Sequence, residues 1–204
     1  EYRRQRQMCI RDRLITAVRR KSREHNWIDC FRSDDNGSSW SFLSKVGDTE
    51  IGNVSNGNPP ALILLADGRL CAVYGNRTDR QIVSKYSDDD GASWGDALVL
   101  RDDFQSANDF PDLGYARLFQ RTDGQLVTTY FCCTPDRPQT HIEATIFDRN
   151  GDRRRAAGAF GGREHQHAVL QVVKDLDMVH HDFGVGSVLE ASRHLADRLT
   201  NVLT

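Results

Sequence analysis

Two copies of one eight-residue pattern constrain the fold of this chain more than any other feature. Segments Ser33–Trp40 and Ser87–Trp94 both read S-x-D-x-G-x-S-W, and they recur at a spacing of about 54 residues, a period typical of repeated supersecondary units. Such a unit cannot bury its apolar face alone, so neighbouring copies have to stack. The sequence therefore predicts a repeat architecture in which similar small sheets pack side by side.

Each copy has the residue types of a tight turn between two β-strands. The aspartates can accept hydrogen bonds from turn amides, and the glycines can adopt a positive φ without a Cβ clash. The tryptophan is expected to cover the turn as an apolar lid. The side chains that define the two turns are Ser33, Asp35, Gly37, Trp40, Ser87, Asp89, Gly91 and Trp94. Neither turn offers the ligand set of a calcium loop, so we expect a structural turn without a metal ion.

A second repeat accompanies the first. The segment Ala61–Leu70 recurs as Ala116–Leu126, and in each an apolar run meets an Asp-Gly turn. A further run follows, Cys71–Tyr74 in one copy and Val127–Phe131 in the other. Two apolar runs around Asp-Gly predict a β-hairpin, to which a third strand and the Ser-to-Trp turn are then added.

Together the two repeats resemble the Asp box and the inner hairpin of the sialidase (neuraminidase) superfamily, whose members are six-bladed β-propellers. The resemblance covers roughly residues 14–150. It implies an all-β fold, a partial six-bladed sialidase-like propeller with two to three four-stranded antiparallel blades and an irregular or helical C-terminal tail. At about 55 residues per blade, six blades need more than about 300 residues. We therefore expect the 204 residues to be a fragment.

The ends of the chain differ from the repeats in character. We expect residues 1–13 to be a non-native leader, residues 14–150 the partial propeller, and residues 151–204 a tail of uncertain origin. Within that tail, apolar residues at helical spacing predict a helix over 188–199.

Composition narrows the classes of partner. A net charge of −2 with mixed signs gives no argument for nucleic acid or membrane. Five cysteines without C-x-x-C spacing indicate neither a disulfide framework nor a zinc site. We expect no cofactor and no metal, and a glycan or glycoconjugate as the partner. The sequence leaves the cellular compartment open, with a secreted or periplasmic location among the alternatives. It also leaves the oligomeric state open.

Propeller geometry places the chemistry at the end of the blades opposite the Ser-to-Trp turns. The loops that enter the first strands and those between second and third strands meet there, near the axis. Arginine recurs in these loops, which predicts a cationic pocket for an anionic or polyhydroxyl ligand. The predicted site residues are Asn58, Asp112 and Tyr115 before the inner strands, and Arg20, Arg77, Arg137 and His141 in or beside the second loops.

The family resemblance implies roles for these residues. Sialidases hold the sugar carboxylate with three arginines and use a tyrosine nucleophile paired with a glutamate, an exception to the two-carboxylate scheme of glycoside hydrolysis. Tyr115 resembles the nucleophile and Arg77 one of the arginines, for which Arg101 is the nearest third candidate. The family's acid aspartate would lie on a blade outside these residues. From its position beside Tyr115 we expect Asp112 as the acid/base, and we expect Asn58, Arg20, Arg137 and His141 to bind the substrate.

Asn58 keeps two functions open. It stands where the family's glutamate is expected, and an amide cannot accept the proton of the Tyr115 phenol. The first function is an exo-acting glycoside hydrolase of acidic sugars, similar to an exo-α-sialidase, with this fragment inactive by itself. The alternative is a non-catalytic β-propeller that binds carbohydrate or protein through an arginine-rich face.

Overall fold

The computed structural model describes residues 9–10, 13–52, 57–104, 112–148 and 153–154. All of them fall within one compact unit, Gln7–Ala156. This part of the chain is all-β without a helix, and none of it forms a helix able to cross a membrane. The helix predicted over 188–199 and nearly all of the predicted leader and tail lie outside the described residues.

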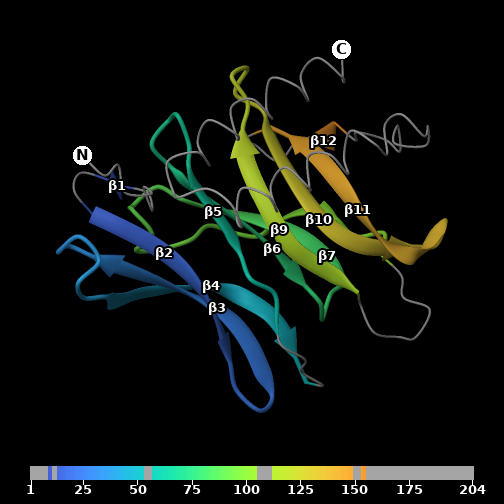
Figure 1. Ribbon diagram of the computed structural model, residues 1–204, viewed down its shortest axis with the longest axis horizontal. Helices are drawn as coiled ribbons and strands as arrows, with labels where there is room; N and C mark the ends of the chain where they lie inside the picture. The colour runs from blue at the N-terminus through green and yellow to red at the C-terminus, as the bar shows by residue number, and fades with distance from the viewer. Residues whose placement is uncertain (1–8, 11–12, 53–56, 105–111, 149–152, 155–204) are drawn as a thin grey trace, which may run out of the picture. The chain divides into compact units, whose positions relative to one another are not determined.

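Within the described residues, twelve strands form three antiparallel sheets of four strands each (Figure 1). The first sheet holds β1 (Cys9–Ile10), β2 (Arg13–Lys21), β3 (His25–Ser33) and β4 (Ser41–Ile51). The second sheet holds β5 (Ala61–Leu64), β6 (Leu70–Asn76), β7 (Gln81–Ser87) and β8 (Leu98–Arg101). The third sheet holds β9 (Leu113–Gln120), β10 (Leu126–Thr134), β11 (Arg137–Phe147) and β12 (Arg153–Arg154).

Within every sheet the strands lie in chain order, each hydrogen-bonded to the next, so each sheet is a simple meander. Three successive four-stranded meanders are the blades of a partial β-propeller, and the predicted fold class is confirmed. The short β1 falls within the predicted leader, where Cys9 pairs with Leu14 of β2.

The repeated hairpins are built in the same way. In the second sheet the Leu65 amide bonds the Arg69 carbonyl at 2.8 Å, and in the third the Arg121 amide bonds the Gln125 carbonyl at 2.8 Å. Gly68 occupies the left-handed region in the first hairpin at a φ of 89°, which only glycine adopts without strain. The second sequence repeat is thus one turn formed twice.

The two Ser-to-Trp turns also share one hydrogen-bond pattern. Asp35 accepts from the Ser39 amide at 2.8 Å and from its hydroxyl at 2.6 Å, and the Ser33 hydroxyl donates to the same carboxylate at 2.7 Å. Asp89 repeats the bonds from Ser93 at 2.8 and 2.6 Å. These donors lower the pKa of Asp35 to about 2 and also lower the pKa of Asp89.

The core lies between the sheets rather than within any one of them. Alternate residues of a strand face opposite sides, so β6 serves two cores and six of its seven residues are buried. The core between the first and second sheets contains Ile15, Ile28, Cys30, Val46, Leu70, Ala72, Tyr74 and Val83. The core between the second and third contains Leu65, Cys71, Val73, Ile82, Leu100, Phe104, Leu113, Ala116, Leu126, Tyr130, Cys132 and Phe147.

The tryptophan of the second turn packs across to the first sheet. Trp94 lies against the core between the first and second sheets, and its indole donates to the Ser44 hydroxyl at 3.1 Å. Ser44 in turn donates to the Gly91 carbonyl at 2.6 Å. Trp94 therefore joins neighbouring sheets, a role that the expected lid over its own turn did not include.

The turn aspartates predict a specific loss of stability in acid. A carboxylate whose pKa is lower in the folded chain stabilises it above the unfolded pKa of about 3.9, and the stability is lost as pH falls toward the folded value. We expect the double variant Asp35→Asn, Asp89→Asn to be less stable at pH 7, and to lose less stability than the parent between about pH 4 and pH 2. Urea unfolding across this pH range measures the difference.

The control for this experiment is Asp102→Asn, which changes an exposed carboxylate outside both turns. It should keep the acid-dependent slope of the parent chain. An unchanged slope in the double variant would contradict the role given to the two turn aspartates.

Candidate functional site

The predicted site residues are best described from the end of the sheets opposite the Ser-to-Trp turns. The strand registers place the start of β3, the end of β4 and the end of β6 at this end, together with the start of β9. A backbone hydrogen bond of 2.7 Å from the Arg77 amide to the Thr49 carbonyl joins the second sheet to the first here. The third sheet joins them through its strand β9.

Asn58 occupies the interior between β6 and β9. It has no exposed surface, and its amide donates to the Gly75 carbonyl at 3.2 Å. A Cβ at Gly75 would lie 2.7 Å from the Asn58 amide nitrogen, and Gly114 faces the same side chain so closely that no Cβ fits. The Asn58 amide is thus a wedge between two strands that approach it through glycines.

Arg77 is also buried, with 7% of its surface exposed. Its Nε donates to the Leu113 carbonyl at 3.4 Å, while its backbone amide bonds Thr49. One residue therefore contacts both neighbouring sheets. The Leu113 carbonyl lies only two residues before Tyr115, so the Arg77 guanidinium supports the segment that presents the tyrosine.

Tyr115 is the unusual residue of this end. It lies in the left-handed region with a φ of 54°, directly after Gly114 at 139°, and the pairing of β9 with β10 shifts at this point. The shift is a β-bulge, a device that redirects a side chain. The phenol is 48% exposed, and its ring lies 5.5 Å from that of Phe131.

Asp112, directly before β9, is held by a residue of β11, two strands away in the same sheet. The Thr140 hydroxyl donates to its carboxylate at 2.5 Å, and the Cys133 thiol lies 3.9 Å from the same oxygen. Asp112 is half-buried and three residues from Tyr115 in sequence. The carboxylate and the phenol are therefore presented by one short segment at the start of β9.

The other predicted residues lie in different surroundings. Arg20 forms an ion pair with Asp29 at 3.5 Å on the first sheet. Arg137 begins β11 and is exposed. His141, on the same strand, is half-buried, and its Nε2 lies 2.9 Å from Glu143. The three basic residues thus sit on two sheets, and two of them already have acidic partners.

A partly buried network of ion pairs surrounds Arg101, which the sequence patterns did not predict. This last residue of β8 donates to Asp103 at 2.6 and 2.9 Å and to Glu143 on β11 at 2.6 Å. It also donates to the Tyr130 hydroxyl at 3.2 Å and lies over the Phe104 ring. The network fastens the second sheet to the third, which commits Arg101 to protein carboxylates instead of a sugar.

The network sets the charge state of its members. Burial by itself would raise the pKa of Glu143, but hydrogen bonds from His141 and Arg101 outweigh it, so the pKa is lowered. Burial would lower the pKa of Arg101, whereas its bonds to Asp103 and Glu143 raise it. Glu143 and Arg101 are therefore both charged across the neutral range.

Glu50 is a second residue that the sequence did not indicate. It is 5% exposed near the end of β4 and accepts from the Asn26 amide at 3.1 Å. Three irregularities in the pairing of β3 with β4 interrupt the alternation of inward and outward residues. A strict two-residue period therefore could not assign Glu50 to the interior.

No family model matches the chain, and no curated protein matches it. Among solved structures, sucrose-6-phosphate hydrolase from Lactobacillus gasseri is similar with a TM-score of 0.50 and 12% identity, over 70% of this chain and 31% of that one. Penicillium chrysogenum α-L-arabinanase in complex with arabinobiose gives 0.49 and 17%, over 66% and 40%. The Hadza microbial sialidase Hz136 gives 0.48 and 18%, over 70% and 34%.

This chain spans no more than 40% of the length of these three proteins. At such identities the likeness concerns the fold alone, which agrees with the partial β-propeller described above.

The close packing of β6 and β9 on Asn58 predicts that one added methyl group will destabilise the folded chain. In Gly75→Ala the new Cβ would lie 2.7 Å from Asn58 and 2.8 Å from the Leu113 side chain, so the strands must separate. We expect a loss of about 1–3 kcal/mol in the free energy of unfolding, as for other overpacked cores. In the control Gly95→Ala the nearest atom lies 3.7 Å away, and the change should stay within about 0.5 kcal/mol. Equal effects in urea unfolding would contradict the wedge.

Removal of the Arg101 charge should lower the free energy of unfolding for a different reason. Arg101→Met leaves Glu143 and Asp103 without the guanidinium to which both are bonded, and breaking a buried pair costs about 3–5 kcal/mol. Because Asp103 is partly exposed, we expect about 2–3 kcal/mol. The control Arg32→Met removes an exposed pair with Asp34 and should cost less than about 1 kcal/mol. Equal losses in chemical denaturation would show that the network adds no more than a surface pair.

Proposed function

We propose that this chain is part of a glycan-acting β-propeller whose substrate lies against Tyr115 and Asp112. The coarser proposal is a role like that of glycoside hydrolases. The finer proposal is exo-acting hydrolysis of acidic sugars, as in sialidases. The fold shared with a protein named sucrose-6-phosphate hydrolase supports the coarser proposal, because it is compatible with chemistry on sugars.

The conformation of Tyr115 carries the proposal. A non-glycine residue in the left-handed region costs about 1–3 kcal/mol, and glycine would remove this cost at φ 54°. The phenol gains little burial in return, since half of it is exposed. A strained, exposed aromatic residue at a bulge favours a function outside the folded chain, and the adjacent Phe131 ring extends the surface.

The residues around Tyr115 can be assigned to proton transfer, nucleophilic attack or positioning. Asp112 can exchange a proton with a leaving group, while its bond from Thr140 fixes the direction of the carboxylate. The neutral Tyr115 phenol suits attack on an anomeric centre that already carries a carboxylate. Asn58 and Arg77 are buried and contact Gly75 and Leu113, so we assign them to positioning the start of β9.

A second candidate function is a non-catalytic propeller that binds carbohydrate. Asn58 favours this second function. A nucleophilic tyrosine needs a base, and the position where a glutamate is expected holds a buried amide, which cannot accept the proton. Both candidates require a glycan at Tyr115. They differ in whether the bond at the anomeric carbon breaks.

The decisive measurement is glycan binding by the 204-residue chain. Saturation-transfer NMR detects this binding. The probes are sialic acid, glucuronic acid and arabinobiose. Tyr115→Ala should weaken binding about tenfold through the loss of aromatic contact, whereas Tyr115→Phe should retain most of it. The matched control Phe42→Ala removes another exposed aromatic ring, on the first sheet, and should leave binding unchanged.

Fluorogenic sialosides and other anionic glycosides, assayed with a longer protein that contains this chain, then separate the two functions. We expect no turnover by this chain by itself, since it spans only 31% to 40% of the three solved structures named above. Turnover that Tyr115→Phe abolishes would establish the hydrolase. Absence of binding to every probe, or equal binding by Tyr115→Ala and the parent, would refute the placement of the glycan at Tyr115.

A further inference from the structure

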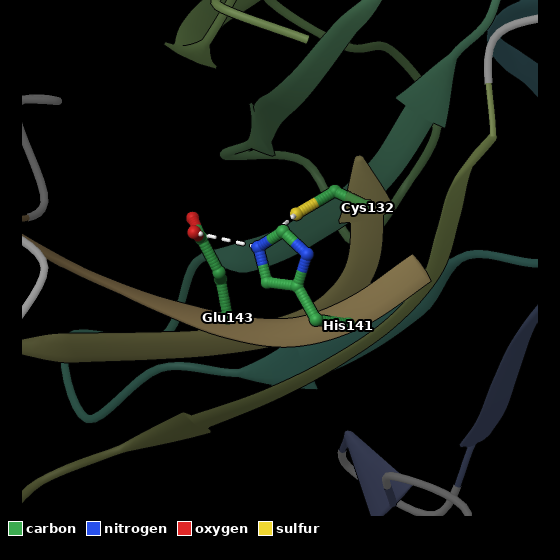
Figure 2. Close-up of side chains that lie close together, drawn as sticks. All are labelled: Cys132, His141 and Glu143. Carbon is green, nitrogen blue, oxygen red and sulfur yellow. Dashed lines mark hydrogen bonds and ion pairs between the residues drawn. The ribbon is translucent and has the colours of Figure 1, made fainter. Parts of the chain in front are cut away.

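Three potential metal ligands converge on one face of the third sheet. Cys132 on β10 pairs directly with His141 on β11, and Glu143 lies two residues further along β11 on the same face. Figure 2 shows the three side chains pointing toward one another. His141 Nε2 lies 2.9 Å from the Glu143 carboxylate and 3.8 Å from Cys132 Sγ, and the three ligand atoms all lie within 4.8 Å of one another.

We propose that Cys132, His141 and Glu143 bind a divalent transition-metal ion, with zinc the best match to their chemistry. Zinc takes thiolate sulfur at about 2.3 Å, imidazole nitrogen at about 2.0–2.1 Å and carboxylate oxygen at about 2.0–2.2 Å, usually in a tetrahedron. Those lengths place neighbouring ligand atoms about 3.4–3.6 Å apart. The observed separation of sulfur from nitrogen is 3.8 Å and that of nitrogen from oxygen is 2.9 Å. The sulfur and the carboxylate oxygen lie within 4.8 Å of each other, so a bound ion would draw these two atoms together by up to about 1.2 Å.

The ring of His141 is oriented as in a metal ligand. Its Nδ1 lies 2.8 Å from the Gln139 carbonyl, which can only accept, so Nδ1 carries a proton. Nε2 then faces the Glu143 carboxylate and the Cys132 sulfur. A backbone carbonyl that fixes the remote nitrogen is the usual support of a ligating histidine. Between Nε2 and the carboxylate a positive species is required, either a second proton on the ring or a metal ion.

The charges around the cluster leave room for such an ion. Arg101 bonds Oε2 of Glu143, whereas His141 faces Oε1, so one carboxylate oxygen keeps its lone pairs for a metal. The Arg101 charge is already matched by the two bonds to Asp103. With the ion bound, the Cys132 thiol releases its proton to solvent, and thiolate and Glu143 balance the two positive charges of the metal.

Burial suggests how the ion would be reached. Cys132 has no exposed surface, whereas the His141 and Glu143 side chains are 14% and 20% exposed. The open side is therefore that of the imidazole and the carboxylate, where water can complete the tetrahedron. Since Glu143 is bonded to Arg101 of β8, a bound ion would also stiffen the junction of the second and third sheets. The proposal is independent of the glycan site at Tyr115.

Cobalt(II) tests the site directly, because a thiolate ligand gives a near-ultraviolet charge-transfer band that oxygen and nitrogen ligands do not. The metal-free full chain is titrated with Co²⁺ and then with Zn²⁺, and calorimetry gives the Zn²⁺ affinity. We expect the band to saturate at one ion per chain, Zn²⁺ to displace Co²⁺, and Zn²⁺ to raise the melting temperature. Loss of a ligand should weaken Zn²⁺ binding by about 100-fold or more.

Two variants and one matched control decide the outcome. Cys132→Ser should abolish the band. His141→Gln, a change at a residue that is less completely buried than Cys132, should abolish the thermal stabilisation by Zn²⁺. Cys133→Ser alters the next residue of the same strand, on the opposite face, and should leave both signals intact. The proposal is overturned if the parent chain shows no band, if Cys132→Ser retains it, or if Cys133→Ser loses it equally. Full stabilisation by Zn²⁺ in His141→Gln, which would point to other histidines, also overturns it.

Discussion

The packing of the second sheet against both neighbours supports everything else in this structure. Strand β6 alternates its side chains between two cores, so that Leu70 and Tyr74 face the first sheet while Cys71 and Val73 face the third. A sheet of this size has too little apolar surface to be stable alone, and each interface supplies what the single sheet lacks. The Trp94–Ser44–Gly91 contact adds a polar connection at the outer turn. Stability is therefore shared between interfaces rather than confined to one interior.

The same interfaces create the end of the sheets where Tyr115 is presented. Glycines at 75 and 114 let β6 and β9 approach the Asn58 amide, and Arg77 reaches across to the Leu113 carbonyl. This close approach leaves β9 irregular at its start, and the irregularity turns the tyrosine outward. The strain at Tyr115 is thus supported by buried contacts on the other side of the strand, as expected when local strain is kept for a function.

A second polar layer lies between the same two sheets. Arg101 joins β8 to Glu143 and Tyr130, and Glu143 connects it to His141 and Cys132. A buried charge network of this kind adds little net stability, but it is costly to leave incomplete. It therefore fixes how neighbouring sheets are aligned, and it holds three metal-binding groups within reach of one another. The exposed surface at Tyr115 and this cluster are separate consequences of one interface.

Much of the architecture follows from local sequence. The Ser-to-Trp turns, the Asp-Gly hairpins and the all-β class depend on short-range hydrogen bonds and on positive φ at glycine, which neighbouring residues dictate. Tyr115 and Asp112 could be placed at the opposite end of the sheets because the repeats fix where each inner strand begins. What only the tertiary structure decided are contacts between residues far apart in sequence: the burial of Asn58 and Arg77, the interior position of Glu50, and the partners of Arg101. The meeting of Cys132 with His141 and Glu143 belongs with them, because strand pairing and bulges bring these side chains together and no spacing along the chain records it.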